Sequence, residues 1–399
     1  MPHYHYLIIG GGMSADAAAG GIREVDPDGA IGLIGAEPDP PYNRPPLSKG
    51  LWKGDALESV WRHSTDEGVT RHLGRQVRSL DPVNKQAVDD QGTAFAFEQC
   101  LLATGGTPRT LPFGGDRIIY YRTVETYRRL RALADQRQQF AVIGGGFIGS
   151  EVAAALAMNG KQVTMLFPEA GIGARVFPED LARFLNDYYR EKGVDVRAGA
   201  SVVGIETRGE RMAVQERDAS ASAGREHEVD GVVAGLGIRP NVELAQTAGL
   251  AVDNGVVVDA LMRTSHPNVY AAGDVAAFTN PTLGQRMRVE HEDNANTMGL
   301  RAGHTMAGRA QPYDYLPSFY SDLFDLGYEA VGEMDARLET VADWKDPFHE
   351  GVVYYLRDGR VRGVLLWNVW DQVEAARRLI AEPGPFRAAD LKGRLPAGS

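Results

Sequence analysis

The stretch Gly10-Gly11-Gly12-Met13-Ser14-Ala15 follows the apolar run Tyr6-Leu7-Ile8-Ile9 and leads into an alanine-rich segment. A second copy of this pattern, Gly144-Gly145-Gly146-Phe147-Ile148-Gly149, follows Phe140-Ala141-Val142-Ile143. Each copy is typical of a turn from a buried parallel strand into a helix, where glycines let the backbone approach a pyrophosphate at the helix N-terminus. One copy alone is a weak signal. Two copies in this context predict two dinucleotide sites, one for a resident cofactor and one for a visiting cofactor.

The composition limits the class of protein. The chain has 399 residues, 43% of them hydrophobic, which is enough for two or three well-packed domains. A formal net charge of −11 disfavours nucleic acid and anionic membranes as partners. The basic runs 127–131 and 71–78 are candidate docking surfaces, although such runs are more often solvated faces.

Targeting signals, cysteines and metal ligands are sparse in the sequence. No segment approaches the about 18 apolar residues of a membrane span, and the start of the chain lacks a signal peptide's basic region, so we expect a cytoplasmic protein. The single cysteine, Cys100, lies in an apolar strand-like run and is expected to be a buried hydrophobe. An internal redox-active disulfide is therefore excluded. His3 and His5 stand without other ligands, so no metal site is expected.

The order of strand and helix patterns predicts an α/β fold. We expect two Rossmann-like dinucleotide-binding domains, the first of them discontinuous, and a C-terminal α+β domain. The expected parts are a first segment at 1–112, a second nucleotide unit at 113–238, a return to the first domain at 239–310, and the last domain at 311–399. A helix is expected from Ser150 to Asn159, after the second glycine pattern. Residues 220–225 are expected to form a hairpin tip or loose loop, and 385–399 a loose tail.

A carboxylate follows the second expected strand of each nucleotide unit. Glu37 comes after the strand at 30–36, and Glu169 comes after the strand at 162–167. Carboxylates in this place accept hydrogen bonds from the adenosine ribose hydroxyls of a dinucleotide.

Further motifs resemble a known family. Residues 41–49, 103–106 and 272–274 resemble the two-dinucleotide flavoprotein reductases. The chain is more specifically similar to the apoptosis-inducing factor-like branch of the FAD/NAD(P)-dependent pyridine nucleotide oxidoreductases, which is related to the ferredoxin, putidaredoxin and rubredoxin reductases. The stretches that carry this resemblance are 166–169, 175–179, 237–245, 288–291, 319–322, 326–330 and 365–368.

The resemblance implies that the first glycine pattern holds FAD. Asp274 would bond a ribityl hydroxyl, Arg44 and Arg109 would hold the pyrophosphate or ribityl edge, and Lys49 would lie near flavin N5. Tyr320 stands where relatives usually have a tryptophan, which keeps a stacking ring. The implied FAD-binding residues are Gly10, Gly12, Ala15, Glu37, Arg44, Lys49, Val77, Ala103, Thr104, Gly105, Arg109, Asp274, Glu290, His291 and Tyr320.

The second pattern would then bind NAD(H). Phe147 would lie over the flavin ring and move when nicotinamide stacks. Glu151 would pair with Lys49. The alternative to this ion pair is a surface lysine and a glutamate that serves only in helix packing. Glu169 would favour NADH over NADPH, although ferredoxin reductases usually keep their acid where Phe167 stands. The implied catalytic residues are Lys49, Phe147, Glu151 and His291. The implied NAD-binding residues are Gly144, Gly146, Phe147, Ile148, Gly149, Glu151, Glu169, Arg175, Gly237 and Glu329.

These inferences leave three functions open. The first is an FAD-dependent NADH oxidoreductase that passes electrons to a ferredoxin, a quinone or another acceptor. The second is a ferredoxin reductase of an oxygenase electron-transfer chain. The third is an NADH-sensing, redox-dependent interaction protein, either a monomer or an NADH-promoted homodimer. None of them requires nucleic acid or a membrane span.

Overall fold

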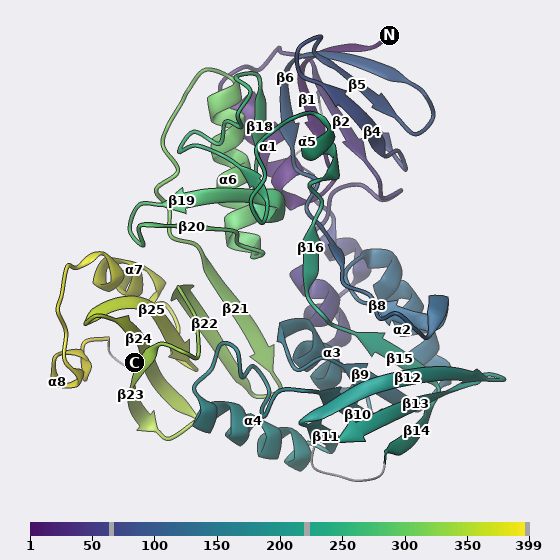
Figure 1. Cartoon of the computed structure of the whole chain (residues 1–399), viewed down its shortest axis with the longest axis vertical. Helices are drawn as coiled ribbons and strands as arrows, with labels where there is room; N and C mark the ends of the chain where they lie inside the picture. The colour runs from purple at the N-terminus through teal and green to yellow at the C-terminus, as the bar shows by residue number, and fades with distance from the viewer. Residues whose placement is uncertain (64–67, 219–223, 396–399) are drawn as a thin grey trace. The chain divides into compact units, whose positions relative to one another are not determined.

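The computed structural model describes residues 1–63, 68–218 and 224–395. The chain divides into two compact units (Figure 1). The first unit comprises Met1–Arg44, Leu57–Thr107 and Arg239–Ser318, and the second comprises Pro45–Ala56, Pro108–Ile238 and Phe319–Ser399. Two short strands, β7 (Gly106–Pro108) and β16 (Ile238–Pro240), pair where the chain passes from one unit to the other.

A seven-stranded sheet organises the first unit. Its order is β3-β2-β1-β6-β5-β4, and β18 also pairs with β6. The strands β1, β2, β3, β6 and β18 run parallel, while β4 and β5 extend the sheet as antiparallel strands. The bounds are β1 His3–Ile9, β2 Ile31–Gly35, β3 Val69–Leu73, β4 Val77–Asp81, β5 Gln86–Asp89, β6 Ala94–Leu102 and β18 Val269–Ala271.

Two helices of the first unit pack closely together because glycines line their contact. These are α1 (Met13–Arg23) and α6 (Glu292–Met306), which run side by side in Figure 1. A Cβ at Gly21 would lie 2.3 Å from the Leu300 carbonyl oxygen, and one at Gly303 would lie 2.1 Å from the Ala18 carbonyl oxygen. Only glycine allows backbones to approach this closely. The smaller elements are α5 Glu243–Thr247 and the sheet of β17 Val256–Val257, β19 Ala276–Asn280 and β20 Gln285–Met287.

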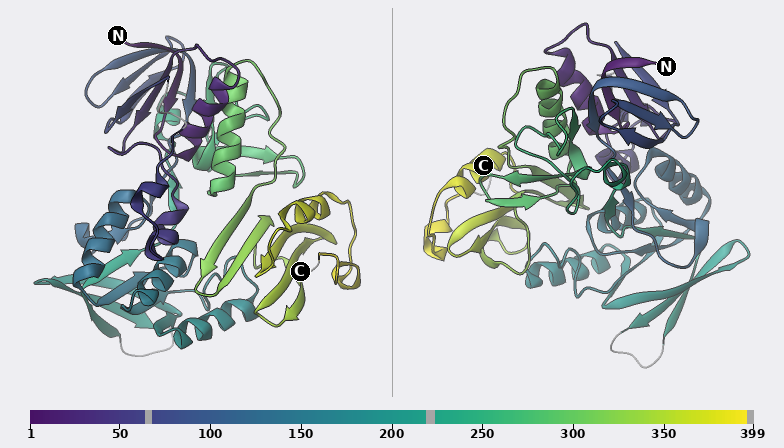
Figure 2. Two further views of the ribbon diagram at one scale, coloured as in Figure 1. Left: turned by 180° about the vertical axis from the view of Figure 1, so that it is seen from behind. Right: turned by 45° about the horizontal axis from the view of Figure 1, so that its top comes forward.

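The second unit contains a parallel sheet in the order β11-β10-β9-β15-β8. Its bounds are β8 Ile118–Tyr120, β9 Gln139–Ile143, β10 Gln162–Phe167, β11 Val194–Ala198 and β15 Gly231–Ala234. The helices of this part are α2 Val124–Gln136, α3 Phe147–Met158 and α4 Glu179–Glu191. An antiparallel sheet of β12 Ala200–Arg208, β13 Arg211–Asp218 and β14 Arg225–Val229 extends to one side of the parallel sheet (Figure 2).

The C-terminal part of the second unit is an antiparallel sheet in the order β21-β22-β25-β24-β23. Its strands are β21 Ser318–Leu323, β22 Leu326–Gly332, β23 Glu339–Asp346, β24 Glu350–Arg357 and β25 Arg360–Trp367. The helices α7 (Val373–Ala381) and α8 (Ala388–Leu391) follow.

The predicted α/β fold with a C-terminal α+β part is confirmed. Two local predictions were wrong. The helix after the second glycine pattern begins at Phe147 rather than Ser150, because Gly146 is its N-cap. Residues 385–395 are not a loose tail, because Leu391 and Leu395 are buried beside α8. Most of the expected hairpin tip at 220–225 lies outside the described residues, and the predicted domain boundaries remain predictions.

The described residue ranges were also compared with the features of a membrane-spanning helix and of a metal site. No helix there combines the length and the apolar character that a bilayer crossing requires. The same ranges contain no cluster of three or more histidine, cysteine or acidic side chains arranged to hold a metal ion.

Candidate functional site

The first glycine pattern forms a turn that leaves space at the N-terminus of α1. Gly10 has a φ of +138°, and a Cβ there would lie 2.1 Å from the carbonyl oxygen of Ala103, so the position requires glycine. Gly12 is the N-cap of α1, and a Cβ on it would meet no described atom within 4 Å. Ala15 is fully buried one turn later. An open N-cap with unpaired backbone N–H groups fits a pyrophosphate.

The second pattern repeats the same geometry in the second unit. Gly144 has a φ of +113°, and its Cβ would lie 2.4 Å from the carbonyl oxygen of Gly235. A Cβ at Gly149 would lie 1.9 Å from the carbonyl oxygen of Gly144, so the first turn of α3 can close on the loop only with glycine there. At Gly146, the N-cap of α3, a Cβ would again meet no described atom within 4 Å. Both loops therefore fit a dinucleotide pyrophosphate.

Glu37 lies just after β2 and is held by two neighbours. Arg44 Nη2 lies 2.5 Å from Glu37 Oε1, and the Tyr42 hydroxyl donates to Glu37 Oε2 at 2.5 Å. Burial disfavours the charge of Arg44, but Tyr42, Glu37 and Asp274 outweigh it and raise the pKa of the guanidinium. The structure thus brings together a carboxylate for ribose hydroxyls and a permanent cation for phosphate.

A second group of predicted residues gathers around Arg288 in the first unit. Arg288 Nη2 lies 2.6 Å from Glu290 Oε1, and Nη1 donates to the Asp274 carbonyl oxygen at 3.1 Å. His291 is the N-cap of α6, and burial lowers its pKa to about 4 against the opposing charges of Asp274 and Asp293. The imidazole is therefore neutral at pH 7. Sequence reasoning quoted Arg288 in a motif but assigned it no role, because Asp274 becomes its neighbour only in the fold.

The remaining predicted residues of the first unit lie at the ends of strands. Val77 is buried at the start of β4. Ala103, Thr104 and Gly105 follow β6, and the Thr104 hydroxyl donates to the Asn241 carbonyl oxygen at 2.9 Å. The Asn241 side chain returns a bond to the Thr104 carbonyl oxygen at 2.8 Å, which fixes this loop.

Glu151 is a buried carboxylate in the second unit. It is only 4% exposed and lies in the second turn of α3. Lys49 Nζ lies 2.7 Å from Oε1, the Ser321 hydroxyl donates to Oε1 at 2.6 Å, and the Ser48 hydroxyl donates to Oε2 at 2.5 Å. The Lys49 ammonium also lies 5.2 Å from the centre of the Tyr320 ring. Sequence reasoning named Lys49, Glu151 and Tyr320 but missed both serines.

Aromatic and acidic side chains extend this part of the second unit. Phe147 opens α3, and its ring centroid lies 5.3 Å from that of Phe319. Ile148 and Tyr320 are exposed. Glu329 lies on β22, and its buried Oε2 has no hydrogen-bond partner among the described residues. Burial, and then the charge of Asp371, raise the pKa of Glu329. An unpartnered buried oxygen here fits a ligand that donates a hydrogen bond.

Glu169 follows β10 and is engaged by Arg175. Arg175 Nε lies 2.9 Å from Glu169 Oε1; the Glu169 side chain is 24% exposed and that of Arg175 is 83% exposed. Phe167, which stands where related reductases have an acid, packs instead against the glycine loop, because a Cβ on Gly145 would lie 2.7 Å from its ring. The Arg109 backbone N–H donates to the Gly237 carbonyl oxygen at 2.9 Å.

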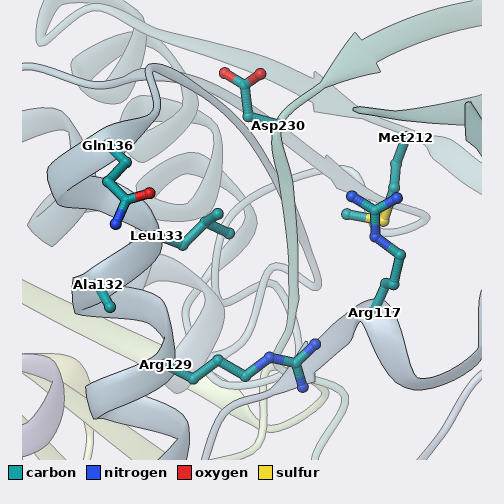
Figure 3. Close-up of a pocket in the computed structure, with 7 residues that line it drawn as sticks. All are labelled: Arg117, Arg129, Ala132, Leu133, Gln136, Met212 and Asp230. Atoms are coloured by element: carbon teal, nitrogen blue, oxygen red, sulfur yellow. The ribbon is translucent and has the colours of Figure 1, made fainter. Parts of the chain in front are cut away.

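A separate hollow in the second unit has a volume of about 290 Å³ (Figure 3). Both of its arginines are already engaged, because Arg129 donates to the Asp116 carbonyl oxygen at 2.6 Å and Arg117 donates to that of Gly209 at 2.9 Å. Another hollow, of about 760 Å³, lies in the first unit. Neither hollow is lined by either glycine loop, so they do not compete with the loops as nucleotide sites.

Two protein families match this chain, and together they cover most of residues 4–382. Residues 4–299 match the family described as "Pyridine nucleotide-disulphide oxidoreductase". Residues 302–347 and 342–382 match "Apoptosis-inducing factor, mitochondrion-associated, C-term".

Full-length relatives include proteins of both related groups. Apoptosis-inducing factor 1 of Dictyostelium discoideum is 33% identical over 94% of this chain and 78% of its own length. The ferredoxin–NAD(+) reductase component of the anthranilate 1,2-dioxygenase system of Burkholderia cepacia is 34% identical over 96% of this chain and 97% of its own length. The reductase in the covalent putidaredoxin reductase–putidaredoxin complex superposes with a TM-score of 0.88 at 30% identity, covering 96% of this chain and 94% of that chain.

Proposed function

This chain belongs to the pyridine nucleotide-disulphide oxidoreductases, whose enzymes pass electrons from NAD(P)H through FAD, and we propose that it prefers NADH to NADPH. We further propose that FAD occupies the first glycine loop and NADH the second. The sequence contains a single cysteine, so the electrons leave the flavin without an internal disulfide.

The preference for NADH is supported by Glu169. Its partly exposed carboxylate stands after β10, where a dinucleotide presents its adenosine ribose. A carboxylate accepts bonds from the 2′- and 3′-hydroxyls of NADH and repels the 2′-phosphate of NADPH. The competing feature is Arg175, because its exposed guanidinium could bind that phosphate if Glu169 did not hold it.

The FAD site is proposed from the residues that the sequence predicts for it. The open N-cap at Gly12 would take the pyrophosphate together with Arg44 and Arg109, and Glu37 would accept the adenosine ribose hydroxyls. Asp274 would bond the ribityl chain. The other proposed contacts are Gly10, Ala15, Lys49, Val77, Ala103, Thr104, Gly105, Glu290, His291 and Tyr320.

The chain's own residues prepare hydride transfer. When bound, FAD accepts a hydride from nicotinamide and gives up electrons one or two at a time. Lys49, held by Glu151, places a positive charge beside the proposed flavin site, where it stabilises negative charge. Phe147 would cover the flavin ring and move when nicotinamide stacks, and Glu329 Oε2, unpartnered among the described residues, would accept a hydrogen bond from the nicotinamide amide. Neutral His291 adds no positive charge at the start of α6, whose first turn already carries Glu292 and Asp293.

The acceptor is the open part of the proposal. A ferredoxin reductase of an oxygenase chain is the second candidate, supported by the full-length match to the Burkholderia cepacia reductase. A redox-dependent interaction protein that senses NADH is the third, supported by the apoptosis-inducing factor match at the C-terminal part. The basic residues of α2 offer little support for docking an acidic partner, because Arg129 donates to the Asp116 carbonyl oxygen and the Arg131 guanidinium lies 5.4 Å from the centre of the Trp52 ring.

The wider setting is also proposed. We expect a cytoplasmic monomer or an NADH-promoted homodimer, with the FAD-binding, NAD-binding and C-terminal domains bounded as predicted from the sequence. The reductase and sensor functions are separated by stopped-flow spectroscopy with NADH. Reoxidation within milliseconds by a ferredoxin or quinone supports the reductase. A charge-transfer band that lasts for minutes, with a doubled mass in light scattering, supports the sensor.

A further inference from the structure

We propose that Ser48 and Ser321 are positioning residues that hold Glu151, and through it the Lys49 ammonium, in the orientation needed for flavin reduction. This inference rests on the proposed function, because it takes Lys49 to lie beside the bound flavin. The hydroxyls themselves need touch neither FAD nor NADH.

The first support is the three donors that contact the Glu151 carboxylate. Oε2 accepts from Ser48 at 2.5 Å, and Oε1 accepts from Ser321 at 2.6 Å and from Lys49 at 2.7 Å. A carboxylate that is 4% exposed loses almost all of its hydration, so it needs close donors to stay charged in the interior. One cation and two hydroxyls meet this need on both oxygens. Each serine therefore fixes a different oxygen and, with it, the plane of the carboxylate.

The second support is the way the two serines are themselves held. Ser48 ends a short 3₁₀ helix, Pro45–Ser48, whose Leu47 carbonyl oxygen accepts bonds from the Trp52 indole at 2.9 Å and from the Tyr121 hydroxyl. Ser321 is 1% exposed on β21, so its side chain is enclosed by the protein. Both side chains are buried, and Glu151 is the nearer acceptor for Ser48, because the Pro45 carbonyl oxygen lies 3.5 Å from its hydroxyl.

The third support is the nature of the lysine. A lysine side chain has four rotatable carbons and a point charge, so it keeps one position only when its partner is fixed. Lys49 is 11% exposed, and its ammonium contacts the Glu151 carboxylate and the face of the Tyr320 ring. If the carboxylate rotates, the ammonium moves with it. The field at the flavin then weakens, although the ion pair itself can persist.

The test compares Ser48→Ala, Ser321→Ala and Glu151→Gln, singly and in pairs, on protein purified with its flavin. We would measure the rate of anaerobic flavin reduction by NADH and the midpoint potential by equilibration with a dye. Each serine variant is expected to slow reduction about tenfold, the scale of a lost hydrogen bond to a charged group. The potential should fall by up to about 30 mV, the equivalent of tenfold in a two-electron equilibrium.

The double variants carry the decision. If the serines act through Glu151, adding either serine change to Glu151→Gln should alter the reduction rate less than twofold. The midpoint potential should change by less than about 10 mV. Ser48→Thr keeps the hydroxyl and should restore the wild-type potential. Ser150→Ala is the matched control, because Ser150 is equally buried on the same helix but donates to the Gly146 and Phe147 carbonyl oxygens.

Three results would overturn the inference. They are wild-type values in both serine variants, full additivity with Glu151→Gln, and an equal loss in Ser150→Ala. If Ser321→Ala does not fold, Ser48→Ala decides alone, because it acts on the other oxygen. Failure of the proposed function is distinguishable, since the wild-type flavin would then not be reduced by NADH at all.

Discussion

A single methyl group added to each glycine loop can show which nucleotide that loop binds. We predict that Gly146→Ala weakens NAD(H) binding and leaves FAD in place, whereas Gly12→Ala weakens FAD binding. Both residues are helix N-caps, and a Cβ on either meets no described atom within 4 Å. The substitutions therefore test the space reserved for a ligand rather than the packing of the protein.

The magnitudes follow from this geometry. Folding should lose at most about 1 kcal/mol, the cost of replacing a favourable N-cap residue by alanine. A methyl group in the open space would push a pyrophosphate away from the backbone N–H groups. Losing one hydrogen bond to a charged group costs roughly 1.5–3 kcal/mol, which is about a 10- to 150-fold weaker affinity.

The assay uses titration calorimetry with NAD⁺ and the flavin-to-protein absorbance ratio. Gly146→Ala should keep a wild-type flavin ratio with at least tenfold weaker NAD⁺ binding, and Gly12→Ala should lower the flavin ratio. Gly20→Ala is the control, because Gly20 lies within α1 and a Cβ on it also meets no described atom within 4 Å. This substitution should leave the binding of both ligands unchanged and raise the free energy of unfolding by about 0.5–1 kcal/mol. A reversed pattern, or unchanged NAD⁺ affinity in Gly146→Ala, would refute the assignment of the loops.

Three further outcomes are expected. Glu169→Gln should raise kcat/KM for NADPH at least tenfold, because it removes a repelling charge and frees Arg175 for the 2′-phosphate; no gain in steady-state assays, or a gain that survives Arg175→Ala, would contradict this. His291 has a folded pKa of about 4, below its unfolded value, so stability is full above about pH 6.5 and is lost as the pH falls towards 4. This pKa difference corresponds to on the order of 3 kcal/mol. In urea denaturation, His291→Gln should remove a loss of this size between those two pH values, and an unchanged loss would refute the prediction. Asp16 is fully buried with Oδ2 2.6 Å from Arg62 Nε, so Asp16→Ala should destabilise the fold by about 3–5 kcal/mol, and a loss below 1 kcal/mol would show that the pair contributes little.

The sequence predicted what local patterns encode. Gly10 and Gly144 predict strand–helix turns, because only glycine fits their φ angles and the close contacts with neighbouring carbonyl oxygens. Cys100 was expected to be a buried hydrophobe, and it is fully buried. Leu391 and Leu395 are four residues apart, a spacing that indicates an apolar helical face near the end of the chain, and both are buried.

The surroundings of Glu151 could not be predicted in the same way. Ser48 precedes the recognised lysine by one residue, and Ser321 lies in a recognised motif, yet neither pattern says where a hydroxyl points. Their convergence arises when the segment at 45–56, α3 and β21 fold into one unit. Arg288 was missed for the same reason, since its contact with the Asp274 carbonyl oxygen joins two segments that are distant in the sequence.

The most direct test of the central claim is an anaerobic titration of the purified protein with NADH and, separately, with NADPH, followed by flavin absorbance. The account predicts a yellow protein whose flavin band is bleached by about one equivalent of NADH per FAD, with NADPH reacting more slowly. A chain that purifies without FAD and gains no stability from added FAD, or a bound flavin that neither nucleotide bleaches, would contradict it.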